Sequence, residues 1–164
     1  MMLERLFTPW RAAYVTGAPT PSAGNCFLCA NPRRNKDKET FILHRGRRGY
    51  ILLNLYPYNS GHLMAAPYDH IGDLVRLDSE TAQELWDLAR LGVRALAEEY
   101  RAEGFNIGMN LGKAAGAGEP GHLHIHVVPR WSGDTNYMPV TAGAKVLPET
   151  LDQTYRRLKP RFPR

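Results

Sequence analysis

Three histidines stand at alternate positions in the apolar run 121–128 (GHLHIHVV). A half-buried β-strand would project the side chains of His122, His124 and His126 from one face, with neighbouring rings about 6.6 Å apart, so that each ring can have its own function. When one nitrogen of an imidazole donates to a backbone carbonyl, the other keeps a lone pair for attack on a phosphate ester near neutral pH. The pattern therefore favours a set of nucleophile and ligand side chains. Two alternatives stay open: two of the histidines hold a catalytic metal, or all three are structural.

The chain has two cysteines, Cys26 and Cys29, in a Cys-x-x-Cys motif. A redox dithiol normally opens a helix after a strand, whereas this pair follows the Pro/Gly-rich segment 17–24 and precedes an Asn-Pro pair. This context favours a metal knuckle over a redox pair. Two thiolates cannot complete a structural zinc site, so two further ligands must come from elsewhere; histidines are the obvious supply, and we select His70 and His122.

A glycine-rich loop, residues 112–121, leads directly into the histidine run. It is not a Walker loop, because it leads into a strand and not into a helix. Backbone N–H groups freed by glycine can form an anion-binding nest, and we place Gly116 and Gly118 among the residues that hold the substrate. A flexible hairpin loop is the alternative.

Apolar runs separated by Gly, Pro and Asn predict five strands, at residues 40–44, 50–54, 62–66, 105–110 and 123–128. Between the third and fourth runs, apolar side chains recur every three or four residues and predict one long helix, which opens at Asp78-Ser79 and closes at Gly104. Its core face carries Leu85, Ala89, Val93, Leu96 and Tyr100. Residues 148–158 predict a second helix, with Pro148 in its first turn. This order of elements indicates the α+β class, with a mainly antiparallel sheet and helices on one side.

The length of 164 residues and the hydrophobic content of 43% predict a single domain over residues 1–164. Within it we expect an N-terminal arm with the zinc knuckle over residues 1–35, and a core with the C-terminal helix and a basic tail over residues 36–164. No secretion signal is visible, and no apolar run reaches the roughly 20 residues that a bilayer span requires. We therefore expect a soluble, cytoplasmic protein with no membrane partner.

The net charge of +5 equals the number of basic residues in the C-terminal tail. These residues are Arg156, Arg157, Lys159, Arg161 and Arg164. The favoured interpretation is a solvated basic tail, and attraction of polyanionic substrates is the alternative. No specific nucleic-acid partner is expected.

The motif His122-x-His124-x-His126-Val127-Val128 resembles that of the histidine triad (HIT) family of nucleotide hydrolases and transferases. Similarity to the branch that cleaves diadenosine polyphosphates covers nearly the whole chain, in the segments 8–11, 54–58, 61–64, 129–131 and 133–136. The resemblance implies a five-stranded antiparallel half-sheet that pairs with a second copy into a ten-stranded sheet of a homodimer. It also implies an intermediate in which a nucleoside monophosphate is bonded to histidine.

The same resemblance implies roles for single residues. His124, the middle histidine of the motif, corresponds to the nucleophile, and His126 supports the transferred phosphoryl group or the leaving oxygen. Asn54 corresponds to the ribose-binding position. Asn110 corresponds to a phosphate-site amide, although an asparagine there could equally cap a turn.

Some HIT proteins bind structural zinc, and the resemblance implies the ligand set Cys26, Cys29, His70 and His122. Four ligands close the coordination sphere, so catalysis would need no metal in the attack. One departure from the family pattern is the pair Gly118-Glu119, where many members carry a glutamine and a hydroxyl residue. Glu119 would either select the acceptor or face solvent. His44 and His62 are expected to be structural, because neither belongs to the alternating set.

The resemblance thus predicts an enzyme that cleaves dinucleoside polyphosphates, with diadenosine tetraphosphate as the favoured substrate, by hydrolysis or phosphorolysis. A nucleoside phosphoramidase or nucleotidyl transferase would use the same intermediate. A zinc-stabilised nucleotide-binding module without catalysis is an alternative of a different class. A metal-dependent hydrolase with His122 and His124 as ligands is a third possibility, and the four-ligand zinc set argues against it.

Overall fold

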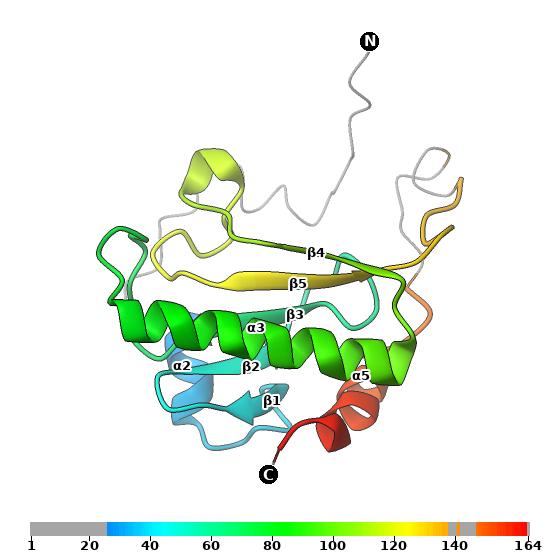
Figure 1. The fold of residues 1–164 in the computed structure, drawn as a ribbon, viewed down its shortest axis with the longest axis horizontal. Coiled ribbons are helices and arrows are strands. Elements are labelled where there is room, and N and C mark those ends of the chain that lie inside the picture. The colour runs from blue at the N-terminus through cyan, green and yellow to red at the C-terminus, as the bar shows by residue number, and fades with distance from the viewer. Residues whose placement is uncertain (1–25, 138–140, 142–146, 164) are drawn as a thin grey trace.

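The computed structural model describes residues 26–137, 141 and 147–163, and its centre is one five-stranded sheet (Figure 1). The strands are β1 (Ile42–Arg45), β2 (Gly49–Leu53), β3 (Leu63–Pro67), β4 (Gly104–Gly108) and β5 (Ile125–Arg130). They pair antiparallel throughout, in the order β1-β2-β3-β5-β4. The helices are α2 (Phe27–Arg33), α3 (Ser79–Tyr100) and α5 (Leu151–Leu158), with short 3₁₀ turns at Lys113–Ala115 and Lys159–Arg161. The predicted α+β class and antiparallel sheet are confirmed.

The long helix α3 begins where the sequence predicts, because Asp78 caps it: the Asp78 carboxylate accepts a hydrogen bond from the Thr81 N–H at 3.0 Å. The predicted end at Gly104 is wrong. The helix stops at Tyr100, and Arg101 takes the left-handed conformation with φ 51°. Gly104 instead opens β4. A glycine usually takes the left-handed conformation at the end of a helix, but here Arg101 takes it. The sequence therefore carries no clear signal for this helix end.

The main core lies between α3 and one face of the sheet (Figure 1). Leu85, Ala89 and Leu96 project from α3 toward the sheet, as the periodicity predicts. Because strand side chains alternate between faces, the residues that meet this helix recur at every second position. They are Ile51, Leu53, Leu63, Ala65, Ile125 and Val127.

The opposite face of the sheet carries α2 and the cysteines. Tyr50, Met64 and their neighbours on this face pack against Leu28 of α2, and the Tyr50 hydroxyl donates to the Leu28 carbonyl at 2.6 Å. Met64 is paired with His126 in the β3–β5 ladder, and paired residues point to the same face. The histidine side of β5 is therefore the side that carries α2, not the side that carries α3.

The C-terminal helix α5 begins at Leu151, three residues later than predicted, with Pro148 outside it. Thr150 and Gln153 form a capping box that fixes this start. In the described part of the predicted basic tail the side chains of Arg156, Arg157 and Arg161 are exposed, but the segment as a whole is anchored to the fold. The side chains of Leu158 and Phe162 are buried in the main core.

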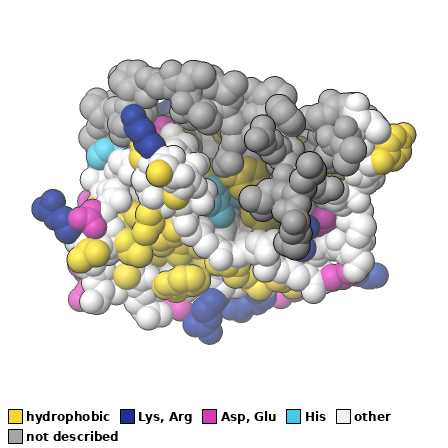
Figure 2. Space-filling view, turned by 90° about the horizontal axis from the view of Figure 1, so that it is seen from above, with side chains coloured by type: hydrophobic (Ala, Val, Ile, Leu, Met, Phe, Trp, Pro, Cys, Tyr) yellow, Lys and Arg dark blue, Asp and Glu magenta, His cyan; other side chains and the backbone are white. Residues whose placement is uncertain are grey.

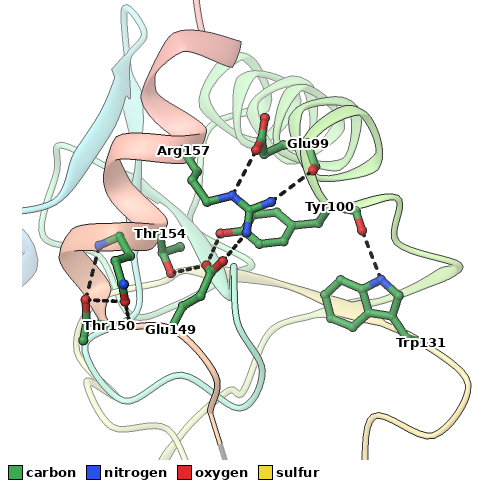
Figure 3. Close-up of polar contacts among 8 residues, drawn as sticks. Glu99, Tyr100, Trp131, Glu149, Thr150, Thr154 and Arg157 are labelled. Carbon is green, nitrogen blue, oxygen red and sulfur yellow. Dashed lines mark hydrogen bonds and ion pairs between the residues drawn. The ribbon is translucent and has the colours of Figure 1, made fainter.

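Figure 3 shows how Arg157 ties α5 to the end of α3. Its guanidinium lies 4.2 Å from the centroid of the Tyr100 ring and forms ion pairs with Glu99 and Glu149. Arg161 also pairs with Glu99, at 2.9 Å. Glu99 is 58 residues from Arg157 and 62 from Arg161 in the sequence, so these two ion pairs could not be recognised from the tail alone.

Residues 1–25, which include most of the predicted N-terminal arm and the family-like segment 8–11, lie outside the described residues. The division into arm, knuckle and core therefore stays a prediction. Among the helices that the structure describes, none combines the length and the apolar composition needed to cross a bilayer.

Candidate active site and metal centre

The three alternating histidines do not all lie in a paired strand. β5 begins at Ile125, so His126 is the only one of the three in the ladder. The residues before it are not paired in the sheet, and the Leu123 N–H donates instead to the Ile71 carbonyl at 2.7 Å. The ring centroids of His124 and His126 are 4.8 Å apart, closer than the spacing of a flat strand predicts. His122 points into the cysteine cluster, whereas His124 and His126 form a separate adjacent pair.

His124 is buried and has a defined hydrogen bond. Its Nδ1 lies 2.9 Å from the backbone carbonyl of His122, so Nδ1 carries the ring proton and donates it. Burial lowers the pKa of His124, which keeps the ring neutral near pH 7. The Nε2 lone pair is therefore available, as a nucleophile requires.

His126 is oriented by His62, which contacts it from the neighbouring strand region. His62 Nε2 lies 2.9 Å from His126 Nδ1, and His62 Nδ1 accepts a hydrogen bond from the Tyr58 N–H at 3.1 Å. Since His62 Nδ1 is an acceptor, His62 Nε2 must be the donor to His126 Nδ1. His126 then carries its proton on Nε2. This series of bonds sets the tautomers of both rings.

The interpretation of His62 as a purely structural residue needs correction, because it is in direct contact with the site. Its position just before β3 places it beside β5, since Leu63 and Val127 are register partners. The two histidines are 64 residues apart in the sequence, and no periodic pattern links them. His44, by contrast, stacks on Phe162, with its Nδ1 3.3 Å from the Pro163 carbonyl, in agreement with a structural role.

The two predicted substrate-binding asparagines lie at the ends of neighbouring elements. Asn54 follows β2, and its amide nitrogen lies 3.4 Å from His62 Nδ1. Its side-chain oxygen accepts from the Tyr56 N–H at 2.9 Å. Asn110 follows β4, whose last residue, Gly108, is paired with His126. Asn54 thus contacts His62, whereas Asn110 comes two residues after the β4 residue that is paired with His126.

The glycine-rich loop contains a tight turn and is not fully extended. Gly112 and Gly116 adopt φ angles of 77° and 83°, which explains why glycine occupies them. The Gly116 N–H donates to the Lys113 carbonyl at 2.9 Å, and Ala117 N–H donates to Gly112 at 3.3 Å. These two N–H groups are engaged within the loop. Gly118, which follows the turn, is the better placed of the two predicted glycines to offer an N–H group to an anion.

Cys26, Cys29, His70 and His122 come together on the α2 side of the sheet. Their donor atoms all lie within 4.8 Å of one another. The Cys29 Sγ is 3.3 Å from His70 Nδ1 and 3.4 Å from His122 Nδ1, and the Cys26 Sγ is also 3.4 Å from His122 Nδ1. Tetrahedral zinc with bond lengths of about 2.3 Å to sulfur and about 2.0–2.1 Å to nitrogen would separate S and N by roughly 3.6 Å. The donor set and its spacing therefore fit a closed zinc site.

Local structure positions each of these ligands. Cys26 caps α2, and its carbonyl accepts from Cys29 and Ala30, so one helical turn brings the two sulfurs together. His122 Nε2 donates to the Pro67 carbonyl at 2.9 Å, which leaves Nδ1 for a metal. Burial lowers the pKa of His122 to about 4, which favours the neutral form of the ring that binds metals. Burial also raises the pKa of the Cys26 thiol to about 12, so this thiol must release a proton when it binds a metal.

Glu119 does not face solvent, so that one of its two alternatives is wrong, while a role in acceptor selection stays a prediction. Its side chain is only 7% exposed and lies beside Cys26. The Oε2 atom has no hydrogen-bond partner among the described residues. Burial raises the pKa of this carboxyl. Glu119 is thus directed toward the metal centre.

Seen from above, a histidine side chain reaches the surface beside a broad hydrophobic area (Figure 2). Exposed apolar side chains near the ends of β2 and β4 include Leu55, Tyr56, Ile107 and Leu111. Apolar surface around a few polar groups is typical of a small-molecule site. The histidine pair can therefore meet a ligand that has both charged and apolar parts.

The fold and the histidine run define a histidine triad protein. The HIT domain family matches residues 35–133, and the chain belongs to this family. Its relatives include the AP-4-A phosphorylase of Mycobacterium tuberculosis, 40% identical over 163 residues, with 95% of this chain and 83% of that protein covered.

Solved structures agree with the fold. A Zn-bound histidine triad family protein from Mycobacterium smegmatis superposes with a TM-score of 0.69 at 26% identity, covering 85% of this chain and 94% of that one. A hypothetical histidine triad nucleotide-binding protein from Sulfolobus tokodaii reaches a TM-score of 0.68 at 22% identity, covering 83% of this chain and 91% of that one.

Proposed function

We propose that this protein cleaves dinucleoside polyphosphates, with diadenosine tetraphosphate as substrate, through a nucleotidyl group bonded to His124. The relative that is 40% identical over 95% of the chain, an AP-4-A phosphorylase, supports this substrate class. The observation that carries the proposal is the hydrogen bond between His124 Nδ1 and the His122 carbonyl. This bond directs the lone pair of a buried, neutral imidazole to Nε2, where it can attack phosphorus.

In the first step, His124 Nε2 attacks the phosphorus next to one adenosine. A P–N bond forms, the P–O bond to the rest of the chain breaks, and its electron pair goes to the bridging oxygen, so that ATP leaves. His126 holds a proton on Nε2, in the tautomer set by His62, and can donate it to that oxygen. Gly118 and Asn110 are our candidates to bind the phosphate oxygens, and Asn54 to bind the ribose.

In the second step, an acceptor attacks the adenylyl-histidine phosphorus and the P–N bond breaks. With orthophosphate as acceptor the product is ADP, and with water it is AMP. The named relative favours orthophosphate. Two steps through a covalent intermediate replace one difficult displacement.

We further propose a structural zinc on Cys26, Cys29, His70 and His122. The spacing of the donor atoms and the Zn-bound relative support this proposal. When bound, the metal would cross-link α2, the segment after β3 and the start of the histidine run. The nucleophile would depend on this cross-link, because the carbonyl of the ligand His122 accepts the His124 Nδ1–H bond.

The physiological form is proposed to be a homodimer with a continuous ten-stranded sheet. β4 is an outer strand of the described sheet, and its second half is exposed. Ile107 in this strand is 42% exposed. An exposed edge strand with an apolar side chain is a natural pairing surface for another strand.

The proposed reaction is tested by chromatography of products after incubation with diadenosine tetraphosphate, with and without orthophosphate. Phosphate-dependent ADP plus ATP would identify a phosphorylase, and phosphate-independent AMP plus ATP a hydrolase. His124→Asn should abolish either reaction, whereas His44→Asn, outside the site, should retain it. Binding of the nucleotide without cleavage would contradict the enzyme and indicate a nucleotide-binding module.

A further inference from the structure

The buried carboxylate of Glu119 has no role in the chemistry above. Glu119 is only 7% exposed to solvent, and its Oε2 atom has no hydrogen-bond partner among the described residues. The neighbours that act on it electrostatically are Cys26 and His70. Both belong to the cluster of four candidate ligands, and Glu119 is not itself one of the four. A buried carboxylate oxygen without a hydrogen-bond partner is costly unless a donor or a cation can approach it.

The backbone brings Glu119 and His70 together on two segments in close contact. The His122 N–H donates to the Glu119 carbonyl at 3.1 Å, so one turn connects Glu119 to a metal ligand. On the other segment, a Cβ added to Gly72 would lie 2.6 Å from the Pro120 oxygen. Because a glycine at position 72 has no Cβ, the two backbones can come this close. The segment that carries His70 therefore packs directly against the turn that carries Glu119.

The four metal ligands are not held equally. His122 is fully buried and fixed by Pro67, and both cysteines are buried at the start of α2. His70 is the least buried of the four, and its hydrogen bond within the described residues is the one to the Cys29 Sγ. It is therefore the ligand that can leave the cluster with the smallest disturbance to the fold.

We propose that Glu119 is a reserve ligand of the metal centre, which binds the metal through its carboxylate in place of His70 when His70 is displaced. Zinc accepts carboxylate oxygen at about 2.0–2.2 Å, so the exchange changes one donor and retains four-coordination. The bond from metal to His70 nitrogen breaks and a bond from metal to Glu119 oxygen forms, with no redox change. This inference rests on the zinc centre proposed above.

The test compares zinc affinity in wild type, Glu119→Gln, His70→Ala and the double variant, by competition with a chromophoric chelator. Glutamine keeps the size and hydrogen-bonding ability of the side chain but loses the anionic donor. We expect Glu119→Gln to weaken zinc binding at least tenfold more in the His70→Ala background than in wild type, because the reserve ligand is needed only there. Equal effects in both backgrounds, or none, would overturn the proposal.

Two additions make the result specific. Asp69→Asn removes an exposed carboxylate next to His70 and serves as the matched control; an effect as large as that of Glu119→Gln would mean a general charge effect and would overturn the proposal. Cobalt substitution gives an independent readout: the His70→Ala protein should keep the intense visible bands of four-coordinate Co²⁺, and the double variant should lose them. If His70→Ala does not fold, His70→Gln replaces it in both measurements.

The proposed metal centre and the proposed role of Glu119 can be contradicted independently of each other. Wild-type protein that takes up no zinc would contradict the proposed metal centre itself. Wild-type protein that binds zinc but shows additive effects of the two substitutions would contradict only the role of Glu119. Neither readout uses catalytic activity.

Discussion

At the scale of single residues, hydrogen-bond partners assign different roles to chemically identical side chains. His122, His124 and His126 are alike in the sequence, but the first presents Nδ1 to cysteine sulfurs, the second donates through Nδ1, and the third accepts at Nδ1. Each assignment follows from a partner contributed by another part of the chain or by the backbone. The alternation predicts that the rings share one face and that each can have its own function, but the hydrogen-bond partners decide which function each ring can have.

Replacement of His62 tests the orientation of His126. In His62→Ala the donor to His126 Nδ1 is lost, so the His126 proton is no longer held on Nε2. We expect kcat for the proposed reaction to fall about 10–100-fold with KM nearly unchanged. Steady-state kinetics measures both constants. His44→Ala is the control, and equal losses of kcat in the two variants would contradict the orienting role.

Asp134 gives a prediction about pH and stability. Its side chain is 6% exposed and accepts from Arg130 Nε at 2.6 Å and from Asn59 at 2.8 Å, and the Arg130 guanidinium holds its pKa well below the usual range. A carboxyl whose folded pKa lies below its unfolded value of about 3.9 stabilises the fold above that pH and loses this contribution as the pH falls.

Denaturant unfolding of Asp134→Asn and wild type at several pH values measures this contribution. The variant should be less stable by about 1–3 kcal/mol at pH 7, and the difference should shrink below about pH 4 as the wild-type carboxyl becomes protonated. A difference that stays constant down to pH 2 would show that charge is not its cause.

At the scale of elements, the sequence predicts most of the sheet, because the strands are apolar runs bounded by Gly, Pro and Asn. The five observed strands lie within two residues of the predicted ranges at each end. One of the errors depends on a tertiary contact and the other on a local backbone conformation that the sequence does not signal. β5 starts late because Leu123 bonds to Ile71, and α3 ends early at a left-handed Arg101. Likewise, the contacts of His62 and Glu119 join segments that no local pattern connects.

The contact between the segments at Gly72 and Pro120 is tested by Gly72→Ala. The added methyl group must displace backbone, because its nearest neighbour is the Pro120 oxygen at 2.6 Å. We expect a loss of about 1–3 kcal/mol in the free energy of unfolding. In Gly104→Ala the nearest atom is 4.0 Å away, so the loss should stay within about 1 kcal/mol. Similar losses in the two variants would mean that the close packing at Gly72 is relieved at little cost.

At the scale of the whole molecule, the sheet separates two tasks. One face holds the main core under α3 and α5, and the other holds the proposed metal ligands and the proposed catalytic histidines. Side chains on the face that carries the histidines can therefore be substituted without disturbing the larger core on the opposite face. The described sheet has two outer strands, β1 and β4, and β4 is the edge that we propose for association.

The proposed homodimer predicts that a charge in β4 will separate the subunits. Ile107→Glu places like charges across a two-fold strand pairing, while Trp86→Glu places a charge on an exposed α3 side chain away from that edge. Light scattering coupled to size exclusion should give a dimer for wild type and Trp86→Glu, and a monomer for Ile107→Glu. A monomeric wild type, or a dimer that survives Ile107→Glu, would contradict association through β4.

The covalent bond between His124 and a nucleotide is the central step of the proposed mechanism. Wild-type protein is mixed with diadenosine tetraphosphate, quenched in alkaline denaturant, and analysed by mass spectrometry of the intact chain and its peptides. We predict one added adenylyl group, located on His124 and absent from His124→Asn. An adduct on another residue, or rapid cleavage by His124→Asn, would contradict the proposed nucleophile and with it the mechanism.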